Sequence, residues 1–73
     1  MVMAHIRYVG TGRKSPEITI TVSMDRGRNW RKQTLKSGQT YNIPPTVTDL
    51  RIDNVPYDPK LKYVVRDGNV AQE

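Results

Sequence analysis

Residues 17–24, Glu-Ile-Thr-Ile-Thr-Val-Ser-Met, are the part of this chain that most restricts its fold. From Ile18 onward apolar and polar side chains alternate, and β-branched residues dominate, which is the pattern of a strand with one buried face. One set of side chains is therefore expected in a core and the other on a polar surface. The inward set is Ile18, Ile20, Val22 and Met24, and the outward set is Thr19, Thr21 and Ser23.

The same period of two recurs along the chain, and no window of about eleven residues has helical periodicity. Further strands are predicted at residues 4–9, 30–36, 40–43, 48–54 and 61–66. Short strands at near-regular spacing predict an all-β fold, either a single small barrel or a sandwich of five to six short, mainly antiparallel strands. A chain of 73 residues suits one domain, so we expect residues 1–73 to form a single β domain.

The strand predicted at 48–54 has a clear division of faces. Leu50 and Ile52 are expected to point inward. The outward positions are Asp49, Arg51 and Asp53. An arginine between two carboxylates neutralises its own surface, so this face is interpreted as solvated rather than as an acid–base pair.

The strand predicted at 30–36 contains a conflict. Trp30 and Leu35 have opposite parity, so both cannot point inward along a regular ladder. We therefore expect either a bulge or one exposed apolar side chain in this strand.

The connections are expected to be loops and turns. Residues 10–16 contain two glycines, two cations and a proline and predict an exposed loop; a phosphate cradle would need a following helix, and a strand follows instead. Residues 55–59, Val-Pro-Tyr-Asp-Pro, predict a stiff, turn-rich connection. Asp67 and Gly68 mark a turn, after which residues 69–73 either pair as a short edge or fray.

Residues 23–30, Ser-Met-Asp-Arg-Gly-Arg-Asn-Trp, join two predicted strands and are interpreted as a hairpin turn. Asp25 can accept hydrogen bonds from amides inside the turn, and Ser23 can bond across its neck. Gly27 can take the positive φ that a β-branched residue avoids, and Trp30 is expected to cover the turn. The predicted structural turn residues are thus Ser23, Asp25, Gly27 and Trp30.

The pattern S-x-D-x-G-x-x-W resembles the Asp-box, a hairpin signature repeated in sialidase-type propellers and found singly in unrelated β folds. The resemblance covers residues 23–30 only, and Asn29 stands where the family often has threonine. In such families the box is structural and lies away from the catalytic centre. The resemblance therefore implies a structural turn, with ligand contact by Asp25 as the alternative, and a single hairpin does not imply a propeller.

The net charge of +5 is unevenly placed, because residues 1–36 carry +6 and residues 37–73 carry −1. A positive first half favours contact with an anionic partner. If its cations share one face, they form a candidate site for an anion or partner; the alternative is a solvated face that keeps strand edges unpaired. These candidates are Arg7, Arg13, Lys14, Arg26, Arg28, Arg31, Lys32 and Lys36.

An enzyme is not expected from the chemistry of this sequence. The one histidine, His5, is interpreted as an ordinary strand residue, and there is no cysteine for a disulfide, a nucleophile or a zinc site. The aspartates lack the spacing of a calcium loop. We therefore expect no catalytic residue, no cofactor and no metal.

The start of the chain lacks the apolar region of a secretory signal, and no run approaches the ~20 apolar residues of a membrane span. We expect a protein without membrane association, located in the cytoplasm or associated with a virion. Small size also makes oligomerisation plausible on physical grounds, since a short chain has little core of its own.

Three functions remain open. The first is a non-enzymatic binding or assembly module that docks on a protein partner or on copies of itself, such as an accessory structural subunit of a viral assembly. The second is a small nucleic-acid-binding barrel that uses the basic hairpin, although Tyr8, Tyr41 and Tyr63 lie in strand patterns typical of a core rather than of a stacking platform. The third is carbohydrate binding through Trp30 and Tyr57.

Overall fold

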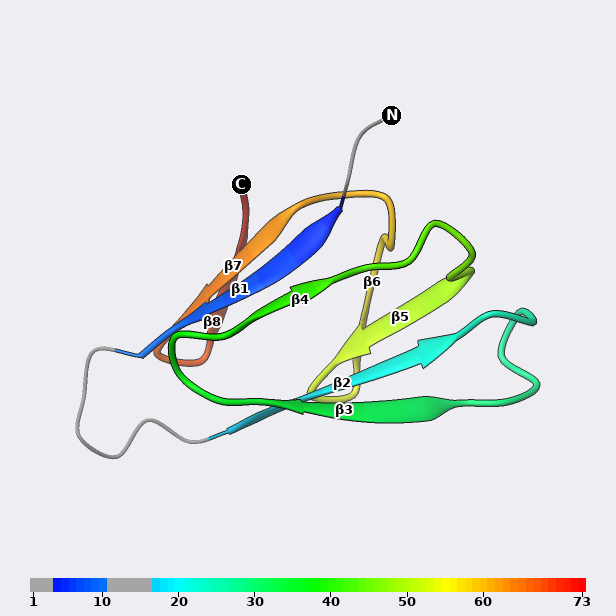
Figure 1. Ribbon diagram of the computed structural model, residues 1–73, viewed down its shortest axis with the longest axis horizontal. Coiled ribbons are helices and arrows are strands. Elements are labelled where there is room, and N and C mark those ends of the chain that lie inside the picture. Colours follow the sequence, from blue (N-terminus) through cyan, green and yellow to red (C-terminus); the bar gives the residue numbers. More distant parts are fainter. Residues whose placement is uncertain (1–3, 11–16) are drawn as a thin grey trace.

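The computed structural model describes residues 4–10 and 17–73 of the chain, and these form an all-β structure with no helix (Figure 1). Eight short strands make two four-stranded sheets that lie face to face like a sandwich, and neither sheet closes into a barrel. Most of the loop predicted at 10–16 lies outside the described residues.

The first sheet has the strand order β4-β1-β7-β8. Its strands are β1 (His5–Val9), β4 (Thr40–Asn42), β7 (Tyr63–Arg66) and β8 (Asn69–Gln72). β1 lies antiparallel to β4 but parallel to β7, and β7 and β8 form an antiparallel hairpin. This sheet is therefore mixed, and its parallel pair joins segments far apart in the sequence.

The second sheet has the strand order β3-β2-β5-β6 and is antiparallel throughout. Its strands are β2 (Ile18–Ser23), β3 (Arg31–Leu35), β5 (Asp49–Ile52) and β6 (Val55–Tyr57). In Figure 1, β2, β3 and β5 form a layer beside the layer of β1, β4 and β7.

The prediction of five to six strands was too low because it missed β6 and left β8 open. β6 occupies the predicted stiff connection at 55–59, where Pro56 pairs with Arg51 of β5. Proline is tolerated there because β6 is an edge strand whose outer side needs no donor. The turn before it consists of Asp53 and Asn54, with φ of 48° and 68°. Positive φ at both residues is typical of the two-residue hairpin turn whose backbone twist matches that of the flanking strands.

The core lies between the sheets and is made by the inward side chains of the alternating strands. Ile6 and Ile20 have no exposed surface, and Leu50 and Ile52 of β5 are buried as predicted. Met24 does not belong to the core, because β2 ends at Ser23 and the methionine side chain is 46% exposed at the start of the turn. Burial of the aliphatic side chains supplies the main stabilising term of the fold.

Tyrosines from both sheets complete the core. Tyr8 and Tyr63 are buried, and Tyr41 and Tyr57 pack partly against the same cluster. The Tyr63 hydroxyl donates to the Asp58 carbonyl at 2.9 Å, so this buried phenol keeps a hydrogen bond. The Tyr57 and Tyr63 rings meet edge to face with centroids 5.3 Å apart, which places β6 opposite β7.

The conflict between Trp30 and Leu35 is resolved without a bulge. β2 and β3 keep an unbroken register from Ile18 opposite Leu35 to Val22 opposite Arg31. Leu35 is buried, whereas Trp30 precedes β3 and remains partly exposed. Of the two expected solutions, the exposed apolar side chain is the one adopted.

Candidate functional site

The turn at residues 24–29 is held by hydrogen bonds to two side chains. The Ser23 hydroxyl accepts from the Gly27 amide at 2.8 Å and donates to Asp25 Oδ1 at 2.8 Å. Asp25 Oδ1 also accepts from the Asn29 amide at 2.8 Å. These contacts place Ser23 at the neck and Asp25 at the centre of the turn, in the roles argued from their chemistry.

Asn29 adds a contact that the sequence interpretation lacked. Its side-chain Nδ2 donates to Asp25 Oδ2 at 2.6 Å, so both carboxylate oxygens of Asp25 have a partner. The Asn29 side-chain bond, followed by the Asn29 amide and Ser23, lowers the pKa of Asp25 from 3.8 to about 2. Asparagine at this position therefore stabilises the charged form of the aspartate.

Gly27 and Trp30 are in contact at the base of the turn. Gly27 has a φ of +92°, and a Cβ at this position would lie 3.5 Å from Trp30 Cζ2. The Arg51 guanidinium of β5 lies 4.5 Å from the centroid of the Trp30 ring, in a cation–π contact. Trp30 is thus flanked by two protein groups, Gly27 and Arg51, and remains partly exposed.

This contact changes the interpretation of the outward face of β5. Arg51 had been expected to neutralise Asp49 and Asp53, but no ion pair joins it to either carboxylate within the described ranges. Asp53 Oδ1 instead accepts from the Thr19 amide at 2.9 Å. The turn is also attached to the segment before β5, because the Arg26 amide donates to Thr48 Oγ1 at 2.9 Å.

The structure distributes the predicted cations over different surfaces. Arg7 lies on the first sheet, whereas Arg26 and Arg28 lie in the turn beside the second sheet. Arg31 and Lys32 are neighbours on β3 and so point to opposite faces of that sheet. The remaining three are Lys36, which follows β3, and Arg13 and Lys14, which lie outside the described residues. The described cations therefore do not gather on one face.

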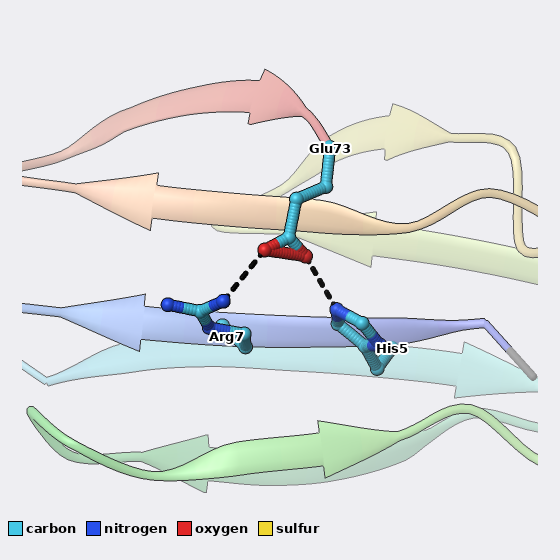
Figure 2. A network of polar contacts seen from close by, with 3 residues as sticks. All are labelled: His5, Arg7 and Glu73. Carbon is cyan, nitrogen blue, oxygen red and sulfur yellow. Dashed lines mark hydrogen bonds and ion pairs between the residues drawn. The ribbon is translucent and has the colours of Figure 1, made fainter.

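A polar network on the first sheet was not predicted. Glu73 reaches across β7 to β1, where its carboxylate accepts from His5 Nε2 at 2.5 Å and from Arg7 Nη1 at 2.7 Å (Figure 2). The bond from His5, with the charge of Arg7 as a further cause, lowers the pKa of Glu73. Parity alone places His5 and Arg7 on one face, but no local signal in the sequence brings Glu73 beside them.

The four sheet edges differ in their protection against pairing with another strand. β3 has Arg31 and Lys32, β6 contains Pro56, and β4 is three residues long and is soon followed by Pro44 and Pro45. Charge, proline and shortness all discourage edge pairing. β8 has the sequence Asn-Val-Ala-Gln, with no charge and no proline, and no described segment pairs with its outer side.

The backbone of β8 alternates between bonding to β7 and facing outward. The Glu73 amide donates to the Lys62 carbonyl at 2.8 Å, which fixes the phase of this antiparallel ladder. Bonded and non-bonded pairs alternate, so Ala71 bonds toward β7 while Val70 and Gln72 direct their amide and carbonyl groups outward. The outward amide and carbonyl groups of these two residues are spaced as an added antiparallel or parallel strand needs for its hydrogen bonds.

The described residues hold no cluster of side chains suited to binding a metal ion. No three His, Asp or Glu side chains among them gather closely enough to hold a metal ion. A surface hollow of ≈ 570 Å³ beside the turn is lined by Met24, Asp25, Arg26, Arg28 and Thr48, and its one carboxylate is already engaged in the turn. No helix in the described part of the chain has the length and apolar character to span a membrane.

Comparison with known proteins gives no relative. No protein-family model, curated protein or solved structure matches the chain.

Proposed function

We propose that this protein is a non-enzymatic binding and assembly module that pairs β8 with an extended strand of a protein partner. The observation that carries the proposal is the unprotected edge of β8, where Val70 and Gln72 direct backbone groups outward and no side chain is charged. The other three edges carry charge or proline or are very short. Natural proteins protect edges in these ways, so one open edge indicates a pairing site.

Strand addition gives affinity through main-chain hydrogen bonds and specificity through alternate side chains. Such a mode needs no catalytic group and no deep pocket. A small module that takes one strand of a neighbour is suited to an accessory role in a larger assembly.

The test compares two variants at Gln72. Gln72→Pro removes an outward amide without breaking a bond to β7, and Gln72→Ala shortens the side chain but keeps that amide. A displayed library of peptides of about seven residues, a length that covers a typical strand, serves as the probe. We expect selected peptides to bind the wild-type chain and the alanine variant but to lose at least about tenfold in affinity for the proline variant. Enrichment of no peptide, or equal binding by the proline variant, would overturn the proposal.

A second candidate, binding of nucleic acid, is favoured by one observation. Arg51 is held on Trp30, and Lys32 lies in the same cross-strand row, with Thr21 between them. This row gives the outward face of the second sheet two cations beside an aromatic ring, a feature of polyanion sites. The neighbouring Asp49 and Asp53 reduce the local charge, which is why this function ranks second.

Retardation of single- and double-stranded DNA at about 50 mM salt tests this second function, because electrostatic binding is strong there. Lys32→Glu should weaken binding and reduce its salt dependence, whereas Lys60→Glu, a charge-matched change in the exposed turn between β6 and β7, should have a smaller effect. No retardation by the wild-type chain would exclude the function.

A further inference from the structure

We propose that the strand bound by β8 alternates apolar and acidic side chains, with its apolar side toward the sandwich core and its acidic side toward solvent. This inference rests on the proposed function and names the chemistry of the partner. It is argued from the two faces that an added strand would meet beside β8.

The inward side of the edge is apolar and incompletely covered. Val70 of β8 is only partly buried and packs against the core cluster. The Tyr57–Tyr63 contact places β6 opposite β7, so β8 and β6 border the same open side of the sandwich. On β6, Tyr57 is partly buried and Val55 is 50% exposed. Apolar side chains of an added strand would cover this border and extend the core.

The outward side of the edge is cationic. Lys62, just before β7, and Arg66, at its end, are exposed, and neither forms an ion pair within the described part of the chain. Outward positions of β8 offer the uncharged Asn69 and Ala71. Neighbouring strands lie about 4.8 Å apart, so a long cationic side chain on β7 can reach over β8 to a strand beyond it.

Two carboxylates adjoin this pair of strands, Asp67 in the β7–β8 turn and Glu73 after β8, and that of Glu73 is engaged by β1. Glu73 accepts from His5 and Arg7 on β1, which directs its negative charge away from the outer side of β8 (Figure 2). The charge of Lys62 acts on Glu73, but neither Lys62 nor Arg66 is held in an ion pair among the described residues, so acidic side chains on the outward face of an added strand could contact both. Opposite charges across neighbouring strands stabilise pairing, whereas like charges oppose it.

A second copy of this chain does not fit these requirements. Its own β8 carries no acidic residue, and its outward side chains are asparagine and alanine. Two chains with a net charge of +5 also repel each other at a distance. Charge complementarity therefore points to an acidic partner strand.

The experiment uses three labelled synthetic peptides of about seven residues that alternate valine with glutamate, valine with threonine, or valine with lysine. Binding to the full chain is measured by fluorescence anisotropy. We expect the glutamate peptide to bind at least about tenfold more tightly than the threonine peptide and the lysine peptide to bind weakest. The double variant Lys62→Glu with Arg66→Glu should remove the advantage of glutamate, and Lys60→Glu should keep most of it.

The Gln72 variants separate this inference from the proposed function, with thermal melts to verify that each variant folds. One outcome is that the glutamate and threonine peptides bind equally, with binding lost in Gln72→Pro but not in Gln72→Ala. That result would overturn the preference for an acidic strand but would support strand addition at β8. Binding of the glutamate peptide that Gln72→Pro does not weaken would overturn both. If none of the three peptides binds, while library peptides of another pattern bind the wild-type chain and lose affinity for Gln72→Pro, only the inference about an acidic strand is overturned. A wild-type dimer that Gln72→Pro dissociates would replace the acidic partner with a second copy.

Discussion

At the scale of single residues, Asp25 concentrates the interactions of the hairpin turn. It accepts bonds from Ser23 and from both the amide and the side chain of Asn29. These bonds favour the ionised carboxylate, and for this reason the pKa of Asp25 is lowered to about 2. The stabilisation that Asp25 gives to the fold must therefore depend on pH.

The first prediction concerns that dependence. Because the folded-state pKa of Asp25 is below its ordinary value of 3.8, its contribution is present above that value and is lost as the pH falls toward about 2. Asp25→Asn should lower Tm by roughly 4–8 °C at neutral pH, and the difference from wild type should shrink near pH 2. Thermal melts across this range measure it, and Asp49→Asn is the charge-matched control at neutral pH. A Tm difference that is the same at both ends of the range would contradict the role assigned to the carboxylate.

The second prediction concerns Arg51 and the sole tryptophan, Trp30. Removal of a guanidinium 4.5 Å from the ring centroid should expose the indole to small quenchers. We expect Arg51→Ala to increase acrylamide quenching of Trp30 fluorescence and to reduce stability by about 0.5–1 kcal/mol. Lys32→Ala, in the same row but without the ring contact, should change the quenching little. Unchanged quenching in the arginine variant would show that the stacked arrangement does not persist in solution.

At the scale of elements, the hairpins differ in how well the local sequence predicts them. The β7–β8 hairpin has the turn Asp67–Gly68, with φ of 49° and 82°, and this pair is a strong turn signal in the sequence. The turn of the β5–β6 hairpin consists of Asp53 and Asn54, which also tolerate positive φ. This hairpin was not predicted, because the proline in β6 favoured a connection over a strand. A proline that excludes a central strand does not exclude an edge strand.

The third prediction follows from the strained turn at Asn54. Its φ of 68° suits glycine and disfavours a residue with a plain Cβ. Asn54→Gly should leave stability within about 0.5 kcal/mol of wild type, whereas Asn54→Ala should reduce it by about 1 kcal/mol. Urea unfolding of the two variants provides the comparison. Equal effects of alanine and glycine would mean that backbone conformation does not determine this turn.

At the scale of the whole molecule, the sequence indicated the fold class but not the arrangement of strands. Alternation in Ile18–Ser23 and in Asp49–Ile52 was enough to identify strands and their buried faces. The parallel pairing of β1 with β7 was not predictable, because it depends on contacts between segments that share no local pattern. The position of Glu73 beside β1 depends on that same pairing and was missed as well, whereas the sequence allowed residues 69–73 to pair as a short edge, which β8 does.

The fourth prediction tests how much the shared core contributes. Ile20 of β2 has no exposed surface and lies between the two sheets. Ile20→Ala should reduce the free energy of unfolding by about 2–5 kcal/mol, through lost burial and the cavity left behind. Thr34→Ala, on an exposed position of β3, should change it by less than about 0.5 kcal/mol. A small loss at Ile20, measured by urea unfolding, would mean that the two sheets do not share one tight core.

The parallel pair of β1 and β7 also determines the order in which the chain can fold during its synthesis. All four strands of the second sheet, from Ile18 to Tyr57, leave the ribosome before β7 does. β1 leaves first and must wait for Tyr63–Arg66 before its parallel partner exists. Pairing over such a long separation is slow, because the entropy of closing the loop is lost before the contacts form. We therefore expect β1 to pair with β4 on one side while its other edge stays open until β7 has been made, and a chain stalled near residue 58 to retain that open, aggregation-prone edge.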